Sequence, residues 1–226
     1  MRFTDRRQAG LYLAERLREP VNGEDRTDEA GVGWPESRTD PLVLALPRGG
    51  VPVAAEVARD MAAELDVLVA RKIGAPGRPE VAVGAVAGEG EPLFDTGSLA
   101  YLGLTPQDMA GDVERERAEM RRREEAYRPG RPAPRIADRT VFLVDDGLAT
   151  GMTSRAALQA VRSERPARIV LAVPVGAPDT VAALRPETDE LVCLHTPHSF
   201  FAVGEWYDDF TQVSDEEVTR LLAGNA

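Results

Sequence analysis

Residues 140–162 read TVFLVDDGLATGMTSRAALQAVR, and this stretch is the strongest indication of the fold class. Its first part is a short apolar run of the kind that forms a buried strand. Two aspartates, Asp145 and Asp146, end the run, and a loop with two glycines then leads into a helical pattern. A strand, a glycine-containing loop and a helix in this order indicate an α/β fold with the loop at the carboxyl end of a parallel strand.

Short apolar runs alternate with helical patterns along the rest of the chain, which is typical of a parallel sheet covered by helices. We expect strands at 41–47, 66–72, 140–146, 167–175 and 190–195, and a further pair at 81–88 and 91–95 joined by a turn. Helices are expected at 50–65, 105–128, 153–163 and 178–184. Residues 20–40 are polar and rich in turn formers, and we interpret them as a mobile surface loop.

Composition excludes several classes of protein. The net charge of -11 argues against general nucleic-acid binding, which needs a basic surface. No apolar run approaches the ~18 residues of a membrane span, and the N-terminus has an amphipathic helical pattern instead of a signal peptide. The single cysteine, Cys193, fits a reducing compartment, so we expect a cytoplasmic protein.

Lysine usage provides a sharper clue. Of the 27 basic residues, Lys72 is the one lysine and all others are arginine. A lysine that remains in such a chain is a candidate for a position where a compact point charge is needed. The alternative is chance survival on a solvated surface.

The loop after the acidic pair has the properties of a phosphate site. The start of a helix attracts anions through unpaired N–H groups and the helix dipole, and the glycines allow close approach. Carboxylates beside it would then bind hydroxyls of the same ligand, or a divalent cation. A ribose 5-phosphate satisfies both demands, with its hydroxyls at Asp145 and Asp146 and its phosphate on the loop, which comprises Gly147, Leu148, Ala149, Thr150, Gly151, Met152 and Thr153. The alternative is a helix-capping turn without a ligand.

Two other segments place basic residues near the ends of predicted strands. Arg48, Gly49 and Gly50 follow the strand at 41–47, and a loop of this kind can form an anion-binding nest. Arg71 and Lys72 end the strand predicted at 66–72. If the sheet is parallel, these residues share one edge with Asp145, and their charge would balance a pyrophosphate.

The three segments together resemble the site of the type I phosphoribosyltransferases. VFLVDDGLATGMTSRAAL resembles their signature for phosphoribosyl pyrophosphate (PRPP), LALPRGGVPVA resembles their pyrophosphate loop, and VARKIGAPGRPEVAVGAV resembles the segment in which a basic residue faces the pyrophosphate. The resemblance is strongest over residues 41–175, and the end of the chain is similar to that of one poorly characterised bacterial subgroup. It implies a single domain over 1–226, with a Rossmann-like core at about 41–195, helices on both faces, and a small hood from the N- and C-terminal segments.

The resemblance further implies transfer of the phosphoribosyl group from PRPP to a nitrogenous acceptor, with release of pyrophosphate and help from Mg²⁺. Asp145 and Asp146 would bind the metal, directly or through water, and Arg48 and Lys72 would take the charge of the leaving group. Ala149 stands where members acting on 6-oxopurines usually carry an aspartate, which disfavours that acceptor class. We expect PRPP and a small-molecule base or other nitrogen acceptor as partners, no nucleic acid and no membrane, with a homodimer left open.

Two other functions are compatible with these motifs. One is a non-catalytic regulatory protein that binds PRPP or a nucleotide, and the other is a phosphoribosyl-handling domain that works alongside a separate hydrolase. The aromatic residues near the C-terminus bear on the acceptor: they either stack a base or seal the sheet edge, and sealing is the interpretation we favour. They are Phe200, Phe201, Trp206, Tyr207 and Phe210.

Overall fold

The computed structural model describes residues 1–18 and 40–224. The surface loop predicted at 20–40 therefore lies, apart from residue 40, outside the described residues. Within the described ranges, no helix is both long enough and apolar enough to cross a lipid bilayer.

Within the described residues, five strands form the central sheet, and every neighbouring pair in it is parallel. The order across the sheet is β2-β1-β6-β7-β8, which confirms the predicted parallel α/β fold. The strands are β1 (Pro41–Ala45), β2 (Glu64–Val67), β6 (Thr140–Val144), β7 (Arg168–Val175) and β8 (Glu190–His195).

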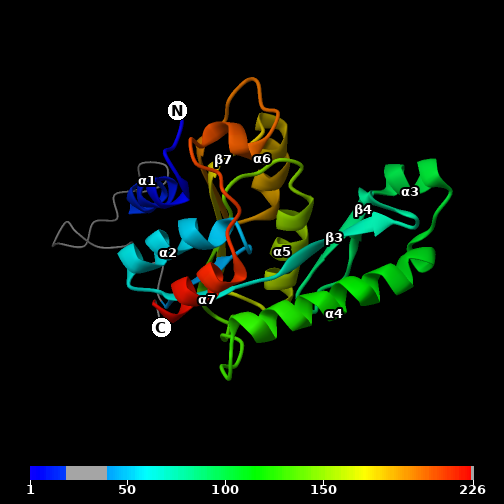
Figure 1. Ribbon diagram of the computed structural model, residues 1–226, viewed down its shortest axis with the longest axis horizontal. Coiled ribbons are helices and arrows are strands. Elements are labelled where there is room, and N and C mark those ends of the chain that lie inside the picture. Colours follow the sequence, from blue (N-terminus) through cyan, green and yellow to red (C-terminus); the bar gives the residue numbers. More distant parts are fainter. Residues whose placement is uncertain (19–39, 225–226) are drawn as a thin grey trace.

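Helices cover both faces of this sheet, as predicted (Figure 1). Alternate residues of each strand point to opposite faces, so Val43 and Phe142 pack in one core and Leu42 and Leu143 in the other. The first core is completed by α1 (Arg6–Arg18), α2 (Gly50–Met61) and α7 (Asp215–Ala223), and the second by α5 (Met152–Ser163) and α6 (Pro178–Leu184).

A second, antiparallel sheet forms an arm that projects from the central sheet (Figure 1). It contains β3 (Ala70–Ala75), β4 (Arg78–Ala87) and β5 (Leu93–Phe94), and the pairing of β4 with β5 confirms the predicted pair of strands. The arm is completed by α3 (Thr96–Leu102), the short 3-10 helix η3 (Pro106–Met109) and the long α4 (Ala110–Tyr127). Outside the arm, the described residues also form the 3-10 helices η4 (Arg185–Glu187) and η5 (Val203–Trp206).

The prediction of one strand over 66–72 was wrong. The chain leaves the central sheet after Val67, and β3 begins at Ala70 with Ala87 as its antiparallel partner. Leu68 and Val69, between the two strands, are apolar and buried. The apolar run in the sequence is therefore continuous, and it gives no sign that one strand ends and another begins. The predicted helix at 50–65 is also shorter, because it ends at Met61 and residue 64 already belongs to β2.

The strand order places a topological switch point between β1 and β6. β1 is followed in the chain by its neighbour β2 on one side, whereas β6 is followed by β7 and β8 on the other. The loops that leave β1 and β6 therefore diverge and open a crevice at the carboxyl edge of the sheet. This is the position at which open α/β sheets bind their ligands.

Candidate functional site

The acidic pair, Asp145 and Asp146, follows β6 directly at this crevice. Oδ1 of Asp145 accepts a hydrogen bond from the N–H of Asp146 at 2.8 Å. Burial raises the pKa of both carboxyl groups, and the neighbouring charge of Asp146 raises the pKa of Asp145 further. Because burial disfavours the charged form, these carboxylates favour a cation or a hydrogen-bond donor beside them.

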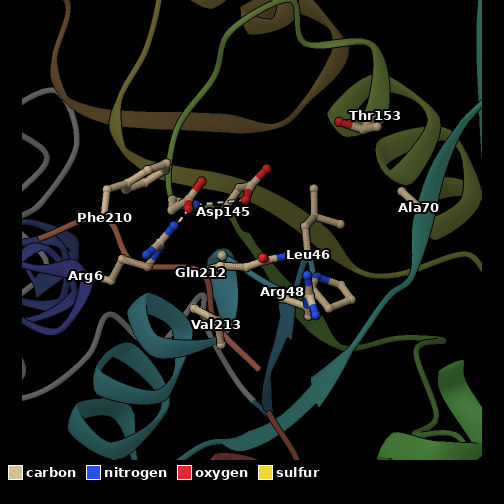
Figure 2. Close-up of a pocket in the computed structure, with 12 residues that line it drawn as sticks. Arg6, Leu46, Arg48, Ala70, Asp145, Thr153, Phe210, Gln212 and Val213 are labelled. Carbon is tan, nitrogen blue, oxygen red and sulfur yellow. Dashed lines mark hydrogen bonds and ion pairs between the residues drawn. The ribbon is translucent and has the colours of Figure 1, made fainter. Parts of the chain in front are cut away.

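Arg6, the first residue of α1, provides such a partner for Asp146. Its Nε donates to Oδ2 of Asp146 at 2.8 Å, and the two side chains are only 10% and 14% exposed. Its Nη1 donates to the carbonyl oxygen of Thr211 at 2.9 Å, and its guanidinium carbon lies 3.9 Å from the centre of the Phe210 ring (Figure 2). The hydroxyl of Tyr207 donates to the carbonyl oxygen of Asp146 at 2.7 Å. Both ends of the chain therefore hold the acidic pair.

The acidic pair lines a cavity of about 330 Å³, which we call the first cavity. Its other walls come from the turn after β1, from the start of α5 and from the C-terminal segment before α7. Figure 2 shows Arg6 and Phe210 on one side of Asp145 and Thr153 on the other. The remaining lining residues are Leu46, Pro47, Arg48, Gly49, Ala70, Gln212 and Val213.

The turn after β1 brings Arg48 into the first cavity as predicted, next to the acidic pair. The Arg48 side chain is 29% exposed, and its Nη1 lies 3.8 Å from Oδ1 of Asp215, at the start of α7. The peptide bond between Pro47 and Arg48 is cis.

The two glycines of this turn have different roles. The N–H of Gly50 donates to the carbonyl oxygen of Leu46 at 3.1 Å, so it is not available to the anion-binding nest predicted for this loop. The N–H of Gly49 has no acceptor in the part of the chain that the structure describes. A Cβ atom at residue 50 would lie 2.7 Å from the carbonyl oxygen of Val144, which excludes a side chain there.

The loop after the acidic pair leaves its N–H groups open. The N–H of Leu148 donates to the carbonyl oxygen of Val175 at 2.9 Å, and this bond fixes the loop to the sheet. The N–H groups of residues 149–153 have no acceptor among the described residues. They lead into α5, the helix whose N-terminus the sequence predicted as a phosphate site.

The glycines of this loop are required by its geometry. Gly151 has a φ of 71°, and a Cβ atom there would lie 2.6 Å from Cγ2 of Thr180. A Cβ atom at Gly147 would lie 2.6 Å from Cγ1 of Val203. The loop therefore packs closely against α6 and η5, and this packing holds its open N–H groups in place.

Lys72 and Arg71 do not lie where they were predicted. They are part of β3 in the arm, because the chain leaves the central sheet before them, so they do not end a parallel strand beside Asp145. Both line a second cavity of about 640 Å³ between β3, the turn that follows it, and α4. Arg71 pairs with Glu116 of α4 at 2.7 Å, whereas the Lys72 side chain is exposed.

The two cavities adjoin each other, because Pro47, Ala70 and Thr153 line both. The second cavity is rich in charged side chains: besides Arg71, Lys72 and Glu116, these are Asp112, Arg115 and Arg123. Lys72 therefore lines the cavity that adjoins the first one.

The five C-terminal aromatic residues differ in their burial and in what they contact. Tyr207 is buried and pairs through its backbone with Phe3, so the two ends of the chain meet beside the site. Phe200 and Trp206 pack against the same small core, which fits the sealing interpretation for these residues. Phe210 lines the first cavity, and Phe201 is 85% exposed.

Sequence reasoning missed Arg6, Gln212 and Val213 as site residues. Arg6 begins an ordinary amphipathic helix, and nothing in its neighbourhood in the chain indicates a partner that lies 140 positions away. Gln212 and Val213 follow the aromatic segment, which is the one local signal that a site could include them.

Comparisons with known proteins agree with this geometry. Residues 35–209 match the family model of the phosphoribosyl transferase domain. Two curated proteins of Mycobacterium tuberculosis, one from strain CDC 1551 / Oshkosh and one from strain H37Rv, carry the name "Putative phosphoribosyl transferase" and are each 42% identical over 220 residues. The match covers 97% of this chain and 46% of each relative, so the chain spans about half the length of these proteins.

Solved structures provide a second comparison. The crystal structure of TT1426 from Thermus thermophilus is 44% identical, with a TM-score of 0.78 over 100% of both chains. The AQ2163 protein from Aquifex aeolicus, at 12% identity and a TM-score of 0.52 over 88% of this chain and 78% of that one, shares the fold. The family model covers most of the chain, including all strands of the central sheet and both loops of the first cavity. The chain therefore belongs to the phosphoribosyl transferase family.

Proposed function

We propose that this protein transfers the phosphoribosyl group of PRPP to a nitrogenous acceptor, with Mg²⁺, and releases pyrophosphate. One observation carries the proposal: a single cavity at the switch point of the sheet is lined by the acidic pair, by Arg48 and by Thr153 at the start of α5. These groups suit the three chemically different parts of PRPP, namely hydroxyls, pyrophosphate and 5′-phosphate.

Each part of PRPP has a place in this arrangement. The 5′-phosphate binds the open N–H groups of residues 149–153 and the dipole of α5. The acidic pair offers carboxylate oxygens to the ribose hydroxyls, because an ionised carboxylate is a pure acceptor. The pyrophosphate lies toward the N–H of Gly49 and the guanidinium of Arg48, in the direction of the second cavity and Lys72.

The donor set of the acidic pair fits Mg²⁺. This ion prefers carboxylate oxygens, keeps several waters, and is usually bound by one or two carboxylates together with the phosphates of a substrate. Asp145 and Asp146 are adjacent, and burial raises their pKa, so a cation beside them would relieve an unfavourable concentration of negative charge. When bound, the metal would neutralise charge on the pyrophosphate.

The side chains of the protein have positioning and electrostatic roles in this reaction. Breaking the bond between C1 of the ribose and the pyrophosphate oxygen leaves positive charge on the ribose and negative charge on the leaving group. Arg48 and Lys72 stabilise the leaving group, while the phosphate loop and the acidic pair hold the ribose still. Ala149 carries no carboxyl group and is exposed at the loop, so we propose an acceptor other than a 6-oxopurine.

A pyrophosphate-release assay with PRPP, Mg²⁺ and a panel of nitrogenous acceptors tests this function. The panel should contain purines, pyrimidines and smaller nitrogen heterocycles, and we expect release with at least one of them. Asp145→Asn serves as the inactive control, because it removes a carboxylate from the first cavity.

A matched binding measurement makes the assay decisive. If calorimetry detects PRPP binding but no acceptor yields pyrophosphate, the transferase proposal fails and a PRPP-binding regulatory protein takes its place. If PRPP does not bind at all, both functions fail.

A further inference from the structure

The two carboxylates of the acidic pair have unequal surroundings. Asp146 is engaged by Arg6 on Oδ2 and by Tyr207 at its carbonyl oxygen, and its side chain is 14% exposed. Asp145 receives one hydrogen bond, from the N–H of its neighbour to Oδ1. No described side chain donates to the carboxylate of Asp145, so its Oδ2 is left for a ligand.

Three contacts hold the Arg6 side chain in place. Its guanidinium donates to Asp146 and to the carbonyl oxygen of Thr211, and it stacks on the ring of Phe210 at 3.9 Å. The Arg6 side chain is only 10% exposed, so its charge is shielded from water. Removal of Arg6 or of Asp146 alone would therefore leave the charge of the remaining residue buried and unpaired.

The backbone of Gly49 lies against the Asp146 carboxylate, nearest to Oδ2, the oxygen that Arg6 also binds. A Cβ atom at residue 49 would lie 2.7 Å from Cγ of Asp146 and 3.2 Å from its Oδ1, so the carboxylate rests directly on the backbone of the β1 turn. Asp146 thus connects three segments that are far apart in the chain: the start of α1, the turn after β1 and the C-terminal segment.

We propose that Arg6 is a positioning residue and that it divides the roles of the acidic pair. Asp146, bound to Arg6, is the anchor that holds the walls of the first cavity together. Asp145, with its open oxygen, is the carboxylate that accepts the ribose hydroxyls. This inference rests on the proposed function, because it assigns the ribose contact within the same cavity.

Calorimetric titration with ribose 5-phosphate in EDTA tests this division without a metal and without turnover. We expect Asp145→Asn to weaken binding by roughly 30-fold, since it removes a charged hydrogen-bond acceptor. The double variant Arg6→Met with Asp146→Asn removes both charges of the anchor together, and its binding should fall by no more than about threefold, because no charge is left unpaired.

The affinities of the single variants show whether Arg6 acts by positioning Asp146 or only by stabilising the fold in general. Arg6→Met alone leaves the Asp146 charge without its partner, and we expect it to weaken binding by about tenfold, an effect that Asp146→Asn should largely reverse. Arg18→Ala is the matched control, since Arg18 lies on the same helix and its side chain is 55% exposed in an ion pair with Asp60. It should bind as the unsubstituted protein does.

The outcomes are distinct. If the double variant binds as weakly as Asp145→Asn, or if Asp145→Asn keeps its affinity, the division of roles is overturned while the proposed function stands. If the effects of Arg6→Met and Asp146→Asn simply add, Arg6 does not act through Asp146. Should Arg6→Met fail to fold, the charge-balanced double variant still gives the comparison with Asp145→Asn. If the unsubstituted protein binds neither ribose 5-phosphate nor PRPP, the proposed function and this inference fail together.

Discussion

Gly49 and Asp146 are in direct contact across the switch point of the sheet, so that a Cβ atom on residue 49 would lie 2.7 Å from Cγ of Asp146. The turn after β1 and the end of β6 therefore fit together with no space for a side chain between them. This contact joins the predicted pyrophosphate loop to the predicted ribose site, and it makes Gly49 a structural requirement of the acidic pair.

Gly49→Ala should disrupt the first cavity. The added methyl group would push the Asp146 carboxylate away from Arg6, at a cost of roughly 1–3 kcal/mol in the free energy of unfolding. We expect PRPP affinity to fall more than about tenfold, as measured by calorimetry. Gly111→Ala is the control, because a Cβ atom there would meet only Nη1 of Arg115, at 3.8 Å within α4, and should stabilise the protein by about 0.5–1 kcal/mol. Equal affinities for the two variants would contradict this account.

Asp145→Asn should stabilise the protein while it impairs ligand binding. Burial and the adjacent Asp146 raise the pKa of Asp145, which means that its ionised form is unfavourable in the folded state at neutral pH. A gain of about 1 kcal/mol would raise Tm by roughly 2–4 °C for a chain of this size. Thermal melts in EDTA at pH 7 measure it, with the exposed Asp208→Asn as a control that should change little.

The pH dependence of that gain has a definite sign. A carboxyl group whose pKa is higher in the folded than in the unfolded protein stabilises the folded state. This stabilisation is fully present below the pKa of the unfolded state and is lost as the pH rises through the pKa of the folded state. Acidification from pH 7 should therefore favour the protonated form of Asp145 in the folded protein and narrow the difference in Tm between Asp145→Asn and the unsubstituted protein. A difference that widens on acidification would contradict the raised pKa.

Lys72→Ala should lower turnover without loss of the ribose site. Lys72 is exposed and lines the second cavity, so its removal should leave thermal stability and ribose 5-phosphate affinity unchanged. If Lys72 reaches the pyrophosphate, kcat should fall by about 10²-fold. Arg78→Ala, an exposed change in the same arm, is the control and should keep full activity. Unchanged kcat for Lys72→Ala would assign the lysine to the solvated surface.

Phe210→Leu should weaken the packing that holds Arg6 beside the acidic pair. It removes the ring that lies 3.9 Å from the guanidinium carbon, at a cost of roughly 1 kcal/mol in unfolding free energy. Phe201→Leu is the matched control, because that ring is 85% exposed and its loss should stay within about 0.5 kcal/mol. Chemical denaturation compares the two, and an equal effect would show that the stack on Arg6 contributes nothing.

Four strands of the central sheet, the two loops at its switch point and the family could be predicted from the sequence alone. β1, β6, β7 and β8 are apolar runs bounded by turn residues, and their signals are local, so each could be recognised from its own residues. The loop after Asp146 was predictable for the same reason, because the glycines it needs and the helix that follows are adjacent in the chain. The same holds for Arg48 and Gly49 after β1.

The features that depend on partners distant in the chain became visible only in the folded protein. The run at 66–72 looked like one strand, but β4 takes Lys72 out of the central sheet and into the second cavity. Arg6 reaches Asp146 because the two ends of the chain meet through Phe3 and Tyr207. Local patterns report the burial and backbone preference of a segment, whereas pairing between remote segments depends on how all of them pack at once, so the surroundings of the acidic pair emerged only in the folded chain.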